Sequence, residues 1–164
     1  MPVTTFSRFA ALLALAALAT GLTALVRPSS FAGLGFRSGV AMAALVAGAA
    51  TTGSLIFSEV YLFEPCRLCW YQRIAMYPLA LTLGIGWWRA DRNVLRYAIP
   101  PAVLGAAISV WHLANQWITT GTTCDVGPSC SVRYVTEFGF VTIPFMALSG
   151  FIAIIGMIYA VRKQ

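Results

Sequence analysis

Two pairs of cysteines are the residues of this sequence whose type and spacing could carry out chemistry. The first pair, Cys66 and Cys69, follows Pro65 at the point where a polar stretch runs into a long apolar one. Proline suits the first turn of a helix, where two cysteines three residues apart share one face. Free amides and the positive end of the helix dipole favour a thiolate there. The spacing therefore predicts a redox-active Cys66–Cys69 pair.

Arg73 is expected to extend the same helical face. It lies four residues after Cys69 and seven after Cys66, so its side chain projects along the face that carries both sulfurs. Its fixed charge could stabilise a thiolate or a reduced cofactor. Arg73 is therefore a candidate cofactor-binding residue.

The first pair also admits three interpretations without redox chemistry. Haem attachment is disfavoured because it needs histidine directly after the second cysteine, where this chain has Trp70. A zinc site could recruit all four cysteines, although the five residues between Cys124 and Cys130 fit the usual ligand spacing poorly. Structural cysteines are the third interpretation. We predict redox chemistry and no resident metal.

The second pair, Cys124 and Cys130, lies in the longest polar segment of the chain. Gly127 and Pro128 between them favour a turn that can bring the sulfurs together. A disulfide here closes a loop of about seven residues and contributes only about 2 kcal/mol. We expect an exposed disulfide open to attack by a partner thiolate. A bridge that merely stabilises the loop is the alternative, and both uses require an oxidising compartment.

His112 is the single histidine of the chain and lies near the end of an apolar run. An ionisable side chain within a membrane is costly, so it indicates either function or a polar contact between helices. Imidazole could donate a hydrogen bond or a proton to a bound acceptor. The neighbouring aromatic residues are expected to form an interfacial belt rather than a cofactor box: Trp70, Tyr71, Trp111 and Trp117.

Membrane helices must position these residues. The 164-residue chain is 59% hydrophobic and 10% charged, with a mean hydropathy of +0.79, too apolar for a soluble domain. Five apolar runs are long enough to cross hydrocarbon, and only helices suit them: Phe9–Val26, Gly39–Leu62, Trp70–Trp88, Tyr97–Ile118 and Phe140–Val161. We predict an all-α integral membrane protein, a four-helix transmembrane bundle over residues 39–164 with an additional apolar helix and a cytoplasmic connection over residues 1–38.

Basic residues indicate the orientation of the helices. The net charge of +6 could suggest nucleic acid, but the basic residues are scattered through short connections and form no face. Alternate connections hold seven of the eleven basic residues, and these sides are expected to be cytoplasmic: Arg27, Arg37, Arg89, Arg92, Arg96, Arg162 and Lys163. The chain is therefore expected to be a multi-pass protein of the cell membrane (the inner or cytoplasmic membrane), with both cysteine pairs on the extracytoplasmic side.

The first apolar run also has features of a secretory signal peptide, because Arg8 precedes an Ala- and Leu-rich stretch. Cleavage would leave Arg27 and Arg37 outside and turn both cysteine pairs inward, against the charge of every later loop. We therefore favour an uncleaved helix with its N-terminus outside. An interfacial helix, or a start site placed too early, would also account for this run.

Taken together, the motifs resemble the DsbB family of disulfide bond formation proteins, and most closely its BdbC-type members. The resemblance spans residues 39–161. It is carried by Pro65–Arg73 with Met76–Pro78, by the short-spaced second cysteine pair, and by Phe138–Phe145 at the start of the last helix. A lone Cys-x-x-Cys would be weak, but these features in order are jointly specific.

This resemblance implies a four-helix bundle that encloses a quinone, ubiquinone or menaquinone, near its outer face. Electrons would pass from an extracytoplasmic thioredoxin-like thiol oxidase of the DsbA or BdbD type to Cys124 and Cys130, with Cys124 attacked first. They would continue to Cys66 and Cys69, with Cys69 facing the quinone. Arg73 would support the quinone and the thiolate, and His112 would lie near the ring.

Two departures from the family pattern bear on these expectations. The extra N-terminal run makes five apolar runs where the family has four, and the short second loop is expected to lack the amphipathic loop helix of the longer DsbB proteins. Vitamin K epoxide reductases also combine four helices, a cysteine pair and a quinone. The residues that follow Cys69, Trp70 to Arg73, argue against that class. A zinc-binding scaffold and a purely structural bundle are the alternatives outside the enzymes.

Overall fold

The computed structural model describes residues 2–118 and 130–162. The elements in order are α1 (Val3–Val26), the 3-10 turn η1 (Pro28–Phe31), α2 (Phe36–Leu55), the π-helical turn η2 (Ile56–Val60), α3 (Arg67–Arg89), α4 (Val94–Ile118) and α5 (Ile143–Arg162). The described residues contain no strand beyond an isolated bridge between Glu137 and Val141. The predicted all-α fold class is therefore confirmed.

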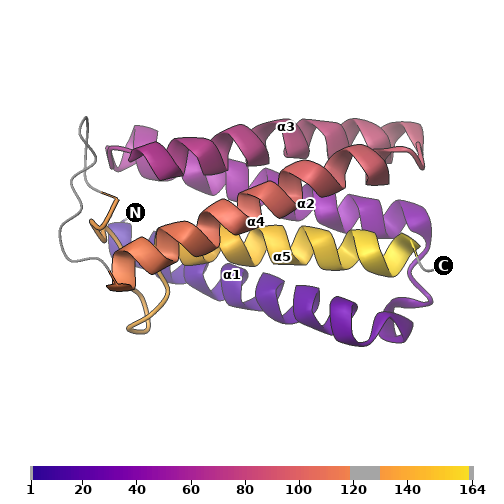
Figure 1. The fold of residues 1–164 in the computed structure, drawn as a ribbon, viewed down its shortest axis with the longest axis horizontal. Coiled ribbons are helices and arrows are strands. Elements are labelled where there is room, and N and C mark those ends of the chain that lie inside the picture. Colours follow the sequence, from indigo (N-terminus) through magenta and orange to yellow (C-terminus); the bar gives the residue numbers. More distant parts are fainter. Residues whose placement is uncertain (1, 119–129, 163–164) are drawn as a thin grey trace.

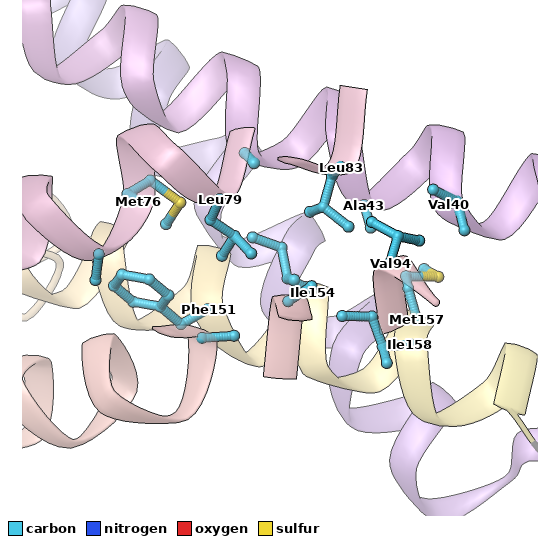
Figure 2. Close-up of a cluster of buried hydrophobic side chains, with 14 residues drawn as sticks. Val40, Ala43, Met76, Leu79, Leu83, Val94, Phe151, Ile154, Met157 and Ile158 are labelled. Atoms are coloured by element: carbon cyan, nitrogen blue, oxygen red, sulfur yellow. The ribbon is translucent and has the colours of Figure 1, made fainter. Parts of the chain in front are cut away.

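Helices α2 to α5 form the predicted four-helix bundle. Each of α2 and α4 packs against both α3 and α5. In Figure 2, Leu79 of α3 points toward Phe151 and Ile154 of α5, within a core to which all four helices contribute. Because lipid is as apolar as these side chains, close packing rather than exclusion of water holds the helices together.

Gly105 of α4 shows how close this packing is. The ring of Phe151 from α5 is fully buried against it. A Cβ atom at position 105 would lie 2.2 Å from Cζ of that ring, much closer than real contacts allow. A small residue at this crossing lets α4 and α5 approach each other.

Four helical elements of the described chain are long and apolar enough to cross a membrane: Val3–Val26, Phe36–Val60, Val94–Ile118 and Ile143–Arg162. They contain most of the predicted runs, with ends that differ by a few residues. The last helix begins at Ile143 rather than Phe140. Phe138 and Gly139 adopt left-handed conformations, with φ of 52° and 79°, in a tight turn closed by two 2.9 Å hydrogen bonds between Glu137 and Val141.

Helix α3 contains the predicted run Trp70–Trp88 and has 23 residues, but it is not apolar enough to count as a span by composition. Its first two turns carry Arg67, Gln72 and Arg73. It packs along both α2 and α4 and runs the length of the bundle (Figure 1). Neighbouring helices thus shield part of its surface, which is why a less apolar helix can lie within the bundle.

One end of the bundle gathers the candidate site residues. The start of α1, the start of α3, the end of α4 and the segment before α5 all lie at this end, and the end of α5 lies at the other (Figure 1). The first pair, His112 and Cys130 therefore come from well-separated places in the sequence to one end of the fold.

Candidate functional site

Cys66 and Cys69 lie at the start of α3, as predicted, but Cys66 is the N-cap rather than a residue of the first turn. Pro65 accordingly precedes the helix, and the expectation that it lies in the first turn is wrong. The Cys66 sulfur accepts the backbone N–H of Cys69 at 3.4 Å, so a sulfur caps this helix. The two Sγ atoms are 3.2 Å apart. This exceeds a disulfide bond length of about 2.05 Å, so the pair is a dithiol within bonding reach.

The two thiols differ in their surroundings. Cys66 is buried, whereas Cys69 is partly exposed. The hydrogen bond that the Cys66 thiol donates to the Cys69 sulfur, together with burial, raises the pKa of Cys66 to about 12. Burial and this hydrogen bond therefore disfavour the thiolate at Cys66.

His112 of α4 lies directly against the first pair. Its side chain is 2% exposed, and its Nε2 is 3.6 Å from the Cys66 sulfur and 3.2 Å from the carbonyl oxygen of Cys130. Since a carbonyl oxygen can only accept, Nε2 carries the hydrogen. The imidazole thus connects the first pair to the segment that carries the second.

Cys130 is 5% exposed. The expectation of an exposed second pair is therefore wrong for this residue, and Cys124 lies outside the described residues. The segment after Cys130 is fixed to the end of α4. The side-chain amide of Gln116 donates to the carbonyl of Val132 at 3.3 Å, and the Arg133 guanidinium donates to the carbonyl of Gln116. These bonds hold Cys130 beneath the surface, near His112.

Arg73 connects α3 to the end of α2. Its Nε donates to the Ser54 hydroxyl at 3.0 Å, and its Nη2 donates to the Ser54 carbonyl at 3.1 Å. The guanidinium also lies over the Trp70 ring, 5.3 Å from its centroid. Among the described residues, no carboxylate forms an ion pair with Arg73. Its charge therefore remains available beside Cys69.

A cavity of about 640 Å³ lies between α1, α2, α3 and α5. Cys69 and Arg73 line its wall at the cysteine end, and side chains such as Leu13, Val46 and Met146 make most of the remainder apolar. Neither Cys66 nor His112 is among its lining residues. Cys69 thus faces the cavity, whereas Cys66 faces His112.

The four aromatic residues expected to form a belt are between 47% and 64% exposed, and none lines the cavity: Trp70, Tyr71, Trp111 and Trp117. This is the placement expected of interfacial residues. A different aromatic group, which no sequence pattern singles out, lines the same cavity as Cys69. The Phe63 ring stacks on Tyr134, with 4.9 Å between centroids, and its centroid lies 6.0 Å from that of Phe57; these three rings also line the cavity.

The sulfurs of Cys66 and Cys69 and the His112 ring also form a potential metal-ligating group, with ligand atoms within 4.8 Å of one another. This set differs from the four-cysteine zinc site considered from the sequence. A ligating histidine usually donates its second N–H to an acceptor. In the described structure His112 Nδ1 is buried and makes no hydrogen bond, which argues against a resident structural metal.

Comparison with known proteins identifies the family. Residues 36–161 match the family described as disulfide bond formation protein DsbB. The chain is 48% identical over 122 residues to a probable disulfide formation protein C 2 of Bacillus anthracis, covering 73% of this chain and 87% of that protein. It is 49% identical over 114 residues to disulfide bond formation protein C of Bacillus subtilis, covering 68% of this chain and 83% of that protein.

A more distant relative lies outside the bacilli. The chain is 42% identical over 108 residues to a probable disulfide formation protein of Coxiella burnetii, covering 63% of this chain and 74% of that protein. No solved structure was found to match the chain. The chain belongs to the DsbB family of disulfide bond formation proteins, among its BdbC-type members.

Proposed function

We propose that this chain is a membrane thiol–disulfide oxidoreductase that reoxidises an extracytoplasmic thioredoxin-like thiol oxidase of the DsbA or BdbD type and passes the electrons to a membrane quinone. The observation that carries the proposal is the two-sided placement of the first pair. Cys69 and Arg73 line an apolar cavity, while Cys66 faces His112 and the Cys130 backbone. One sulfur thus lies at a hydrophobic acceptor site, and the other lies against the histidine that contacts the Cys130 carbonyl.

The first exchange oxidises the partner. A partner thiolate attacks Cys124, breaks the Cys124–Cys130 bond and releases Cys130 as a thiolate. The burial of Cys130 disfavours attack at that sulfur and supports Cys124 as the target. The second partner thiolate then breaks the mixed disulfide, which leaves an oxidised partner and a Cys124 thiolate. Two electrons have then moved from the partner to this chain.

The second exchange moves those electrons to the first pair. The Cys130 thiolate attacks Cys66 of the Cys66–Cys69 disulfide and releases Cys69 as a thiolate. The Cys124 thiolate then attacks Cys130, restores the Cys124–Cys130 disulfide and releases Cys66. The contacts of His112 with both the Cys130 carbonyl and the Cys66 sulfur support this route, because they hold the two segments together.

The cavity residues fit a quinone. The walls are apolar, and a guanidinium that is not ion-paired within the described chain lies beside Cys69. Arg73 uses two N–H groups on Ser54 out of the five that a guanidinium carries, so it can also donate to a quinone oxygen. A bound quinone would supply a two-electron, two-proton acceptor for the dithiol. In this arrangement Arg73 stabilises the Cys69 thiolate, and the apolar walls exclude water.

The cysteine end is proposed to face the extracytoplasmic side of the cell membrane. The helix ends at the opposite end of the bundle carry basic residues, which is the bias expected of a cytoplasmic face (Figure 1): Arg37, Arg89, Arg92, Arg96 and Arg162. Labelling of the reduced cysteines by a membrane-impermeant maleimide in intact cells tests the assignment. Labelling only after permeabilisation would reverse it.

The relay is tested by counting partner dithiols oxidised per chain without quinone, using excess reduced partner and acid quenching. Each disulfide accepts one pair of electrons, so the wild-type chain should oxidise about two equivalents. Cys69→Ser should oxidise about one, because only the second pair remains, and Cys124→Ser should oxidise none. Full oxidation by Cys124→Ser would mean that the partner reacts elsewhere, and the proposed order would be wrong.

A further inference from the structure

Helix α1 lies outside the residues that match the family, 36–161, yet it packs closely on the bundle. It runs along α5 (Figure 1), and this is the most extensive helix–helix contact in the described chain. A Cβ atom on Gly21 would lie 2.7 Å from the Ala153 backbone, and one on Gly156 would lie 2.4 Å from the Gly21 carbonyl oxygen. Such an approach of two backbones is possible only between small residues. The position of α1 is therefore fixed by close packing.

The N-terminal end of α1, which lies at the same end of the bundle as the cysteines, also contacts the segments around the site. Ser7 is buried and donates to a Glu137 carboxylate oxygen at 2.6 Å, while Arg8 lies 3.5 Å from the other oxygen. Glu137 belongs to the turn between Cys130 and α5. Next to Ser7, the Phe6 ring packs against Phe57 of η2, with 5.1 Å between the ring centroids. These contacts hold α1 in a set position relative to the cysteine end.

Between α1 and α2 the packing is different. α1 makes its main helix contact with α5, and no packing of similar extent joins it to α2 in the described chain. The cavity occupies this gap, with six α1 residues on one side: Phe6, Phe9, Ala10, Leu13, Ala14 and Ala17. These residues recur along several turns of one helical face, so the apolar wall extends away from Cys69 and Arg73 along the membrane-spanning direction.

From this geometry we infer that α1 forms the lipid-side wall of the acceptor cavity and holds the polyprenyl tail of the quinone, an inference that rests on the proposed function. The cavity is continuous with Cys69 and Arg73, so the same occupant must present a polar, reducible head at one end and an apolar extension at the other. A quinone with an isoprenoid tail has that form. Since lipid solvates the tail as well as protein does, the wall acts through packing and confinement.

Leu13 and Leu12 provide a matched pair for a test. They are adjacent on α1 and similarly exposed, at 48% and 56%, but only Leu13 lines the cavity. In Leu13→Trp the larger ring fills space that the tail would occupy. In Leu12→Trp the same ring is added outside the cavity. Thermal unfolding of both variants, measured beside binding, shows whether either substitution disturbs the packing of α1.

The experiment measures equilibrium binding of two probes to the full chain in detergent. One is a menaquinone with a four-isoprene tail, and the other is menadione, which has the same ring without the tail. We expect Leu13→Trp to raise the Kd of the tailed quinone by about ten-fold, the scale set by misfit of one apolar group. The Kd of menadione should stay within about two-fold of wild type, and Leu12→Trp should change neither value by more than that.

Each other result overturns the inference in its own way. Equal binding of the tailed quinone by Leu13→Trp and wild type would mean that α1 does not confine the tail. Equal losses in Leu13→Trp and Leu12→Trp would indicate a general disturbance of α1. Loss of menadione binding by Leu13→Trp would place the wall at the ring instead. If the wild-type chain binds neither of these quinones nor a ubiquinone with the same tail, the proposed acceptor itself is wrong, and this outcome separates the two failures.

Discussion

Replacing His112 with phenylalanine should slow electron transfer between the two cysteine pairs. The imidazole Nε2–H is 3.2 Å from the Cys130 carbonyl oxygen and 3.6 Å from the Cys66 sulfur. Phenylalanine fills much of the same buried space but cannot donate. A neutral hydrogen bond contributes about 1 kcal/mol and one to a charged group up to about 3 kcal/mol. At about 1.4 kcal/mol per factor of ten, the step should slow by about 5-fold to 150-fold.

The assay follows the first pair directly. The oxidised chain is mixed with reduced partner in a quench-flow instrument, free thiols are trapped by alkylation, and mass spectrometry gives the fraction of Cys66 and Cys69 that has become reduced. The rate of this conversion reports transfer between the pairs, whereas partner oxidation in the same samples reports the first exchange. Only the former should fall in His112→Phe.

A conservative substitution provides the control. In His112→Gln the side-chain amide can donate from a position similar to imidazole Nε2, so most of the transfer rate should return. The family resemblance instead implies that His112 lies near a quinone ring, and this alternative makes a different prediction. Unchanged reduction of the first pair in His112→Phe, with slower quinone reduction, would refute the reasoning and support a role at the acceptor.

Three further predictions concern the bundle, the cavity and the dithiol. Gly105→Ala should destabilise the bundle by about 1–3 kcal/mol, seen as a lower Tm in detergent, because its Cβ would lie 2.2 Å from the Phe151 ring; an unchanged Tm would mean that the crossing relaxes freely. Arg73→Gln should slow quinone reduction by about 10-fold to 150-fold through loss of a charged donor, while the rate of partner oxidation stays unchanged. Equal losses in quinone reduction and in partner oxidation would mean that Arg73 has a structural role. Zinc should inhibit the reduced chain reversibly, because the three ligand atoms at the first pair lie within 4.8 Å of one another; activity that persists in zinc, before any chelator is added, would contradict this.

Much of the fold could be predicted from the sequence, because long apolar runs indicate membrane helices. The ends of the helices were less predictable. The start of α5 depends on left-handed conformations at Phe138 and Gly139 and on a bridge formed by Glu137 and Val141, none of which hydropathy detects. Likewise, α3 is held by its neighbours despite Arg67 and Arg73, which a single-helix criterion cannot anticipate.

The candidate site was likewise predictable only where its residues lie close together in the sequence. Cys69 and Arg73 are close in sequence, so helical spacing placed them correctly on one face of α3, whereas Cys66 caps this helix. The pairing of Cys66 with His112 joins residues far apart in the chain, and no local pattern indicates it. The burial of Cys130 was missed for the same reason, because the bonds that Gln116 and neighbouring residues make to the following segment are tertiary.

Anaerobic stopped-flow of the purified chain with reduced thioredoxin-like partner, following quinone absorbance, tests the central claim most directly. The wild-type chain should reduce one quinone for each partner dithiol oxidised, and Cys69→Ser should reduce none while still oxidising partner once. Quinone absorbance that does not change in the wild-type chain, although partner is oxidised, would contradict the account and leave the cavity beside Cys69 without its proposed acceptor.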